Sequence, residues 1–116
     1  MDDEPAIRRL ASRMLKLMGM DVVEAGDGHE ALKCLEHPGT QVDAILTDFR
    51  LPDIQGSDLA IWMREKIPGI PIIYFTGSSP QEIPTEELAR EDTHFLGKPF
   101  TKESLHVVLN NVFAVC

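Results

Sequence analysis

An apolar run at residues 44–47 ends on a single carboxylate, Asp48, and the chain then turns sharply. Ile45 and Leu46 are bulky side chains bounded by turn-forming residues, which predicts a short buried strand. The turn passes through Pro52 towards Gly56. In an open parallel α/β sheet, ligands bind in the crevice outside the carboxyl ends of the strands. Asp48 is therefore expected at the edge of the fold where ligands bind.

The rest of the chain alternates between helical and strand patterns. Helical segments carry apolar residues at three- and four-residue spacing, and strand segments are short apolar runs bounded by Gly and Pro. Strands that alternate with helices on short connections predict right-handed crossovers and a parallel sheet covered on both faces. The fold class is therefore α/β with a doubly wound parallel sheet. The expected helices are 5–18, 29–37, 57–67, 85–90 and 101–112, and the expected strands are 21–25, 44–48, 70–75 and 94–96.

Local signals indicate how some of these helices begin and which face they bury. Pro5 suits the first turn of the first helix, and Thr101 is expected to cap the last helix. In the helix at 57–67, the apolar spacing predicts an inward face made of Leu59, Trp62, Met63 and Ile67.

Composition and charge narrow the range of functions. The 116 residues are 43% apolar and 26% charged, ordinary values for one globular domain with one modest core. The formal net charge of −8 argues against a nucleic-acid or anionic-membrane surface, since both require clustered Lys and Arg. Cys34 and Cys116 have no zinc or disulfide spacing, and no apolar run approaches the roughly 18 residues of a membrane span. A cytoplasmic protein with free thiols is expected.

Two further charged groups are placed to meet Asp48. Asp2 and Asp3 stand just ahead of the first helix, and Lys98 follows a short apolar run near the other end of the chain. Carboxylates gathered in a small volume repel one another unless a cation neutralises them, and their hard oxygen atoms suit Mg²⁺. Lysine supplies a point charge for an anion such as phosphate. Together these residues predict phosphoryl chemistry, although the acidic pair alone also suits a solvated helix cap.

Four motifs of the chain resemble those of response-regulator receiver domains, the switch domains of two-component phosphorelay systems. Each motif is weak alone, but together they stand in the order and approximate spacing of that family, on a matching α/β pattern. The resemblance covers nearly the whole chain and implies the flavodoxin-like receiver fold. The motifs are Asp2-Asp3-Glu4-Pro5, then Asp48 with Leu51-Pro52-Asp53 and Gly56, then Thr76-Gly77, and finally Lys98-Pro99-Phe100.

The resemblance implies roles for the charged residues. Asp48 would be the phosphoacceptor, receiving a phosphoryl group from a histidine kinase or a histidine phosphotransfer protein. Asp3, with Asp2 assisting, would hold Mg²⁺ together with the Asp48 carboxylate and the backbone carbonyl of Arg50. Lys98 would pair with the phosphoryl oxygens. Such a domain is a signalling switch rather than an enzyme, because it catalyses only its own phosphoryl uptake and loss.

The resemblance also implies how the signal leaves the domain. The Thr76 hydroxyl would move to hydrogen-bond the phosphoryl group, and Phe95 would then turn inward. This change would reshape the face that a downstream effector protein or domain recognises, as in a two-state switch biased by phosphate. Dimer formation is left open.

One departure from the family concerns the start of the chain. Receiver domains carry a hydrophobic strand directly before the acidic pair, in the middle of the sheet and beside the strands expected near Asp21 and Asp43. Here Met1 stands in its place. Either the sequence is truncated or another chain fills the slot, since an empty slot leaves strand edges unpaired. Truncation is the favoured expectation, so that residues 1–116 form a receiver domain shortened at its amino end.

Two other functions compete with the phosphorylated switch. One is a pseudo-receiver or strand-swapped module, in which the missing strand disables the site and protein contacts alone carry the function. The other is a metal-dependent phosphohydrolase with a nucleophilic aspartate. The haloacid-dehalogenase type of phosphohydrolase carries a second aspartate two residues after the nucleophile, and Arg50 occupies that position here. The phosphohydrolase is therefore disfavoured.

Overall fold

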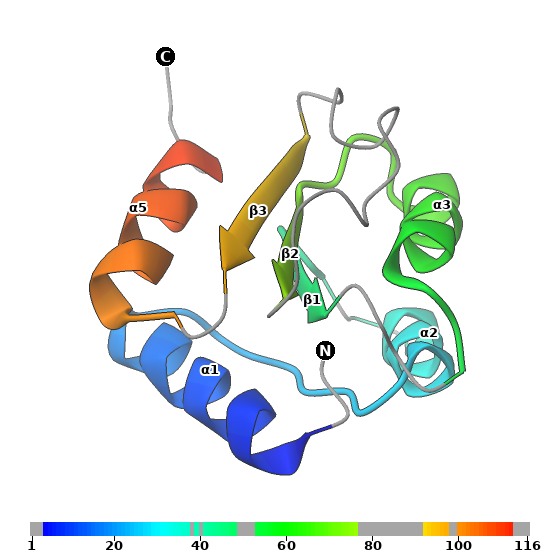
Figure 1. Ribbon diagram of the computed structural model, residues 1–116. Coiled ribbons are helices and arrows are strands. Elements are labelled where there is room, and N and C mark those ends of the chain that lie inside the picture. Colours follow the sequence, from blue (N-terminus) through cyan, green and yellow to red (C-terminus); the bar gives the residue numbers. More distant parts are fainter. Residues whose placement is uncertain are drawn as a thin grey trace.

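The computed structural model describes residues 4–37, 39, 41–48, 53–76, 92–97 and 100–112, without the side chains of residues 56, 57 and 76. Within these residues helices and strands alternate through most of the chain, as expected (Figure 1). None of the described helices is long and apolar enough to cross a membrane. The elements in chain order are α1 (Pro5–Leu17), α2 (Gly28–Glu36), β1 (Ile45–Asp48), α3 (Gly56–Lys66), β2 (Ile72–Thr76), β3 (Thr93–Gly97) and α5 (Lys102–Val112).

The described strands form one parallel sheet in the order β1-β2-β3. Asp48 pairs with Phe75, and Thr76 pairs with Gly97. Because parallel strands run in the same direction, their carboxyl ends meet at one edge of the sheet, where the three arrowheads of Figure 1 point. The predicted parallel sheet is confirmed.

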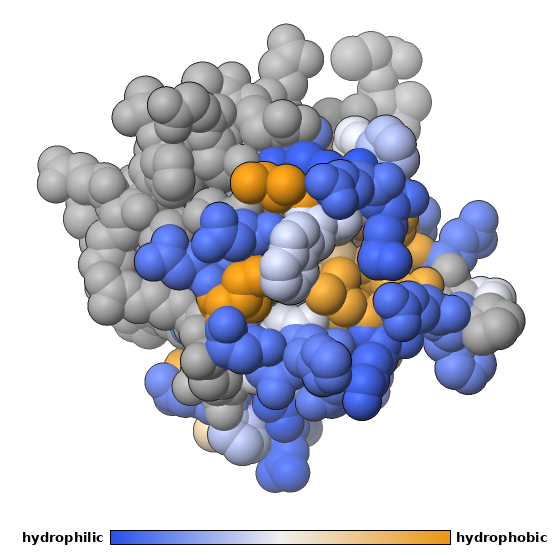
Figure 2. Space-filling model, turned by 90° about the vertical axis from the view of Figure 1, so that its right-hand side faces the viewer, coloured by the Kyte–Doolittle hydropathy of each residue, from blue (hydrophilic) through white to orange (hydrophobic). Residues whose placement is uncertain are grey.

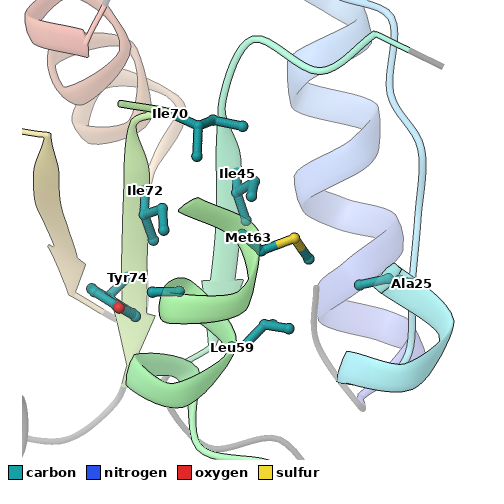
Figure 3. Packing of buried hydrophobic residues seen from close by; sticks show 9 residues of the cluster. Ala25, Ile45, Leu59, Met63, Ile70, Ile72 and Tyr74 are labelled. Atoms are coloured by element: carbon teal, nitrogen blue, oxygen red, sulfur yellow. The ribbon is translucent and has the colours of Figure 1, made fainter. Parts of the chain in front are cut away.

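Helices cover both faces of this sheet, with α1 and α5 on one side and α2 and α3 on the other (Figure 1). Strand β2 alternates between the two cores: Ile72 and Tyr74 belong to the cluster beneath α2 and α3, whereas Ile73 and Phe75 belong to the cluster beneath α1 and α5. Figure 3 shows the first cluster at the α3 face. Burial on both faces explains why β2 reads as a continuous apolar run in the sequence.

The helix starts follow local chemistry. Pro5 occupies the first turn of α1, as predicted. At α5, the Thr101 Oγ1 atom accepts from the Ser104 backbone N–H at 3.1 Å, and the Ser104 Oγ atom accepts from the Thr101 N–H at 2.9 Å. This reciprocal pair satisfies two backbone donors that the helix itself leaves free. The predicted Thr101 cap is confirmed.

The expected strand at residues 21–25 is wrong. These residues form no strand, and none of their backbone groups hydrogen-bonds to another described residue. The reason is that a strand is stabilised by a ladder of backbone hydrogen bonds to a neighbour, and no described strand pairs with this segment. Ala25 nevertheless packs in the core beneath α2 and α3. The expected helix at 85–90 lies outside the described residues.

The outer face of α3 departs from the expected burial. Leu59 and Met63 are buried as predicted, but Trp62 is 44% exposed and its neighbour Ile61 is 55% exposed. Figure 2 looks at the side of the molecule that carries α2 and α3, and it shows hydrophobic surface between hydrophilic side chains. The prediction for Trp62 was wrong because its position lies one helical step, about 100°, from Met63 and turns away from the sheet.

A charged pair joins α3 to the start of β3. The Arg64 Nη2 atom donates to the Asp92 Oδ1 atom at 3.0 Å and to the Thr93 Oγ1 atom at 2.9 Å. The Asp92 carbonyl also accepts from the Ile72 N–H at 2.8 Å. With the Arg64 side chain only 10% exposed, this pair is shielded from water and fixes the amino end of β3.

We expect Leu59→Ala to lower the free energy of unfolding by about 2–5 kcal/mol, because it removes a fully buried side chain and leaves a cavity. Ile61→Ala on the same helix is the matched control and should change that free energy by only about 0.5 kcal/mol, since Ile61 is exposed. Urea denaturation followed by circular dichroism measures both. Equal losses in the two variants would contradict the packing described for α3.

The pH dependence of stability should report on His94. Burial lowers the pKa of the His94 imidazole below its ordinary value of 6.5, and the nearby Asp92 carboxylate only partly offsets this. The His94 imidazole therefore binds a proton more weakly in the folded protein than in the unfolded chain. The contribution of neutral His94 to the free energy of unfolding is complete above pH 6.5 and is lost as the pH falls through the lowered pKa. We expect His94→Gln to flatten the fall in urea midpoint between about pH 8 and pH 5. The control His106→Gln changes an exposed imidazole on α5 and should keep the parent's profile.

Candidate functional site

The carboxyl edge of the sheet is the candidate site, and Asp48 stands on it. Asp48 ends β1 with a half-buried side chain, and β2 ends beside it at Thr76. The preceding residue, Thr47, is 1% exposed, and its Oγ1 atom donates to the Asp48 carbonyl oxygen at 2.9 Å. The backbone of Asp48 is thus held by strand pairing and by a buried hydroxyl, while its carboxylate stays within reach of solvent.

The remaining predicted site residues are described only in part. Asp2, Asp3, Arg50 and Lys98 lie outside the described residues, and of Thr76 the structure describes the backbone but not the side chain. The predicted grouping of Asp2, Asp3, Arg50 and Lys98 with Asp48 therefore stays a prediction.

Chain neighbours of those residues do lie at the expected end of the fold. Glu4, which follows the acidic pair, is the N-cap of α1, and Gly97, which precedes the lysine, ends β3. The amino end of α1 and the carboxyl ends of the strands face the same side of the molecule (Figure 1). The topology therefore brings Glu4 and Gly97, which adjoin the acidic pair and the lysine in the sequence, to the end of the fold that carries Asp48.

Phe95 lies on β3 opposite Tyr74 and packs, half-buried, against the core cluster beneath α2 and α3. Its Cε1 atom lies 4.0 Å from the position that a Cβ atom would take at Gly97. The ring therefore reaches along the strand towards the carboxyl edge, where a glycine leaves it room. Whether Phe95 changes its position remains a prediction.

A second aspartate near the site has a partner that the sequence did not reveal. The Asp53 Oδ1 atom accepts from the Gly28 N–H at 3.0 Å, and its Oδ2 atom accepts from the His29 N–H at 2.9 Å. Asp53 thus caps the amino end of α2 from a distant part of the chain. The helix also has a local cap, since the Asp27 Oδ1 atom accepts from the Glu30 N–H at 2.8 Å.

These bonds act on the charge of Asp53. Burial tends to raise its pKa, but the backbone N–H groups of Gly28 and His29 together with its own N–H and the charge of His29 hold the pKa of Asp53 below its ordinary value of 3.8. The carboxylate therefore remains ionised near neutral pH, which favours its place at the positive end of a helix dipole.

Apolar packing also joins α2 to the chain before α3, because Gly28 of α2 lies directly against the Ile54 side chain. A Cβ atom added at Gly28 would clash with the Ile54 Cγ2 atom and would lie 3.5 Å from the Leu59 Cδ1 atom. Any larger residue at position 28 would have to push Ile54 and the start of α3 away. The glycine therefore allows α2 to approach the residues that follow the Asp48 strand.

The described residues other than Asp48 add no metal site of their own. No group of three His, Cys, Asp or Glu residues among them is placed to hold a metal ion. Most of the predicted Mg²⁺ ligands lie outside the described residues. The chemistry of the donor set, carboxylates and a carbonyl oxygen, nevertheless fits Mg²⁺.

A parallel sheet with helices on both faces and an aspartate at its carboxyl edge is the arrangement expected for the receiver domains of two-component signalling. The family described as response regulator receiver domain matches residues 1–110, and the chain belongs to this family. It is a signalling domain rather than a classical enzyme. The predicted flavodoxin-like receiver fold is confirmed by solved structures that align with nearly the whole chain.

Three known proteins illustrate the relationship. The luminescence regulatory protein LuxO of Vibrio campbellii is 31% identical over 110 residues, which cover 95% of this chain and 24% of that protein. The chemotaxis protein CheY4 of Vibrio cholerae is 32% identical with a TM-score of 0.83, covering 97% of this chain and 93% of that one. The receiver domain of the sensor histidine kinase PA1611 of Pseudomonas aeruginosa is 28% identical with a TM-score of 0.80, covering 98% and 93%, and its active-site cleft coordinates a magnesium ion. The chain thus spans about a quarter of the length of LuxO.

We expect Gly28→Ala to lower the free energy of unfolding by about 1–3 kcal/mol, because the new methyl group clashes with Ile54. Gly26→Ala is the matched control: its new methyl group lies 2.9 Å from the terminal Nη1 atom of Arg8, which can move aside, and makes an ordinary contact with the Glu30 Oε2 atom at 3.6 Å. Ile54→Ala removes the obstructing Cγ2 atom, so Gly28→Ala should cost less in the Ile54→Ala background than in the parent. Thermal or urea unfolding measures all of these variants, and a Gly28→Ala variant as stable as Gly26→Ala would contradict the described contact.

Proposed function

We propose that the chain is a phosphorylation-dependent switch that accepts a phosphoryl group on Asp48. The observation that carries this proposal is the position of Asp48 at the carboxyl edge of a parallel sheet, half-buried and beside the end of β2 at Thr76. A carboxylate at a strand end whose backbone is held by Thr47 suits the in-line attack that phosphoryl transfer requires, and this supports the proposal.

Charge neutralisation is the main requirement of this reaction, since the transferred group and the acceptor are both negative. We assign Mg²⁺ binding to the carboxylates of Asp3, Asp2 and Asp48 and to the backbone carbonyl of Arg50. When bound, the metal ion would offset the charge that gathers on the phosphoryl oxygens. The Lys98 ammonium group would bind those oxygens from another side. The magnesium ion in the receiver domain of the PA1611 kinase supports this assignment by analogy.

The switch itself is assigned to Thr76 and Phe95. Thr76 stands at the end of β2, and Phe95 reaches towards the same edge from β3, where Gly97 leaves space beside its ring. A hydroxyl drawn to the phosphoryl group would change the packing available to this ring. A ligand that favours one of two packings shifts the population towards it, which is sufficient for signalling.

The partners follow from this chemistry. We propose a histidine kinase or a histidine phosphotransfer protein as the phosphodonor, acting in the cytoplasm, and an effector protein or domain as the receiver of the signal. Related domains occur in a regulatory protein, LuxO, and in a sensor histidine kinase, PA1611, so both settings suit a domain of this kind. The net charge of −8 disfavours direct binding to nucleic acid or to an anionic membrane.

One observation favours the second candidate, a module that acts through protein contacts alone. Residues 21–25 make no backbone hydrogen bond to any described residue, which leaves these backbone groups for pairing with an added strand. A strand contributed by another chain would form backbone hydrogen bonds with residues 21–25. That function predicts an oligomer that grows with protein concentration and needs no phosphoryl group, which sedimentation velocity distinguishes from the switch.

We expect the purified protein to gain one phosphoryl group when it is incubated with Mg²⁺ and acetyl phosphate, measured by intact mass. Asp48→Asn should gain none because the amide is not a nucleophile, and chelation of Mg²⁺ should abolish the gain in the parent. Asp43→Asn changes an exposed aspartate close to β1 and serves as the matched control that should still be modified. A parent chain that unfolds cooperatively yet stays unmodified would refute the phosphoacceptor role of Asp48.

A further inference from the structure

We propose that Asp53 is a positioning residue for the phosphoacceptor. Its carboxylate ties the segment that leaves β1 at Asp48 to the amino end of α2, and so sets the rate at which Asp48 takes up a phosphoryl group. This inference rests on the proposed function of Asp48. It assigns to Asp53 a role beyond capping a helix.

Both flanks of the connection 49–52 are held by ordered elements. On one side, Asp48 pairs with Phe75 and its carbonyl accepts from the buried Thr47 hydroxyl. On the other side, the two oxygens of Asp53 accept from two successive backbone N–H groups, at 3.0 and 2.9 Å. Only four residues separate Asp48 from Asp53, so the position of Asp53 limits the distance over which the chain can move away from Asp48.

The geometry of this anchor is more specific than that of an ordinary cap. An N-cap residue satisfies the amides of its own helix from the adjoining chain, as Asp27 does at Glu30. Asp53 instead reaches across 24 and 25 residues and uses each carboxylate oxygen on a different amide. A forked, charge-assisted contact of this kind restrains orientation as well as distance.

Apolar packing reinforces the same contact. Ile54, the next residue, lies against Gly28 so closely that no side chain would fit there, and it also packs on the core cluster beneath α2 and α3. The hydrogen bonds of Asp53 and the packing of Ile54 therefore both hold the amino end of α2, at Gly28 and His29. Removing the carboxylate leaves the apolar contact in place, so the fold should survive the change.

The expected kinetic effect follows from what the reaction demands. Phosphoryl transfer depends on in-line placement of the acceptor, and small displacements of a reacting group reduce the rate strongly. A segment released from its anchor samples more conformations, of which fewer place the site correctly. We expect phosphoryl uptake to slow about 3- to 10-fold in Asp53→Ala, the range for losing the net contribution of one ordinary, solvent-exposed hydrogen bond that favours the productive conformation.

The decisive comparison is between the two aspartates that cap α2. Asp53→Ala and Asp27→Ala each remove a carboxylate from the same helix end, but only Asp53 belongs to the segment that follows Asp48. Initial rates of uptake from acetyl phosphate with Mg²⁺ are measured by intact mass on the whole chain, together with urea unfolding. We expect Asp27→Ala to stay within about 2-fold of the parent rate, even where it loses as much stability. Asp53→Asn keeps one acceptor oxygen and should fall between the parent and Asp53→Ala.

Amide hydrogen exchange at Gly28 and His29 reports directly whether the hydrogen bonds to Asp53 are lost in each variant. We expect both amides to lose protection in Asp53→Ala and to keep it in Asp27→Ala. If protection is lost while uptake is unchanged, or if Asp27→Ala slows uptake equally, the positioning role is wrong and the function of Asp48 stands. If the parent takes up no phosphoryl group at all, the proposed function is wrong and the positioning role is refuted with it.

Discussion

The structure depends on the pairing of β2 between two parallel neighbours. Ile72 and Tyr74 face one core and Ile73 and Phe75 face the other, so this single strand joins the two hydrophobic clusters. Each of these side chains is at most 1% exposed, and burial of that extent contributes on the order of 2 kcal/mol per residue. The same pairing brings the carboxyl ends of the strands to one edge. Stability and the location of the site therefore have a common cause.

The surroundings of Asp48 are those that the proposed phosphoacceptor role requires. Strand pairing and the Thr47 hydroxyl hold its backbone, whereas its side chain stays only half-buried. A fully buried carboxylate would become protonated and lose its nucleophilic character, and a fully exposed one would lack orientation. Five residues further along the chain, the Asp53 side chain accepts from two backbone N–H groups of α2.

Two structural predictions were wrong because they depended on tertiary contacts: the pairing of residues 21–25 with another strand, and the direction that Trp62 faces on α3. Residues 21–25 have an ordinary strand composition, but a strand exists only when another strand accepts its hydrogen bonds, and composition cannot show that. Trp62 lies three residues after Leu59, as expected for a core position, but it is rotated by about 100° around the helix from the buried Met63 and is exposed to solvent. The Asp53 contact spans 24 and 25 residues, so no local pattern could have indicated its partners.

The sequence by itself determined the alternation of helices and strands, the parallel sheet, the place of Asp48 at a strand end and the caps at Pro5 and Thr101. These features depend on residues within a few positions of one another, where side-chain periodicity and backbone chemistry act directly. Only the tertiary structure decided which segment became a strand, which face of α3 met the core and which amides Asp53 would cap. Those outcomes depend on contacts between distant parts of the chain, which exist only once the layers have packed together.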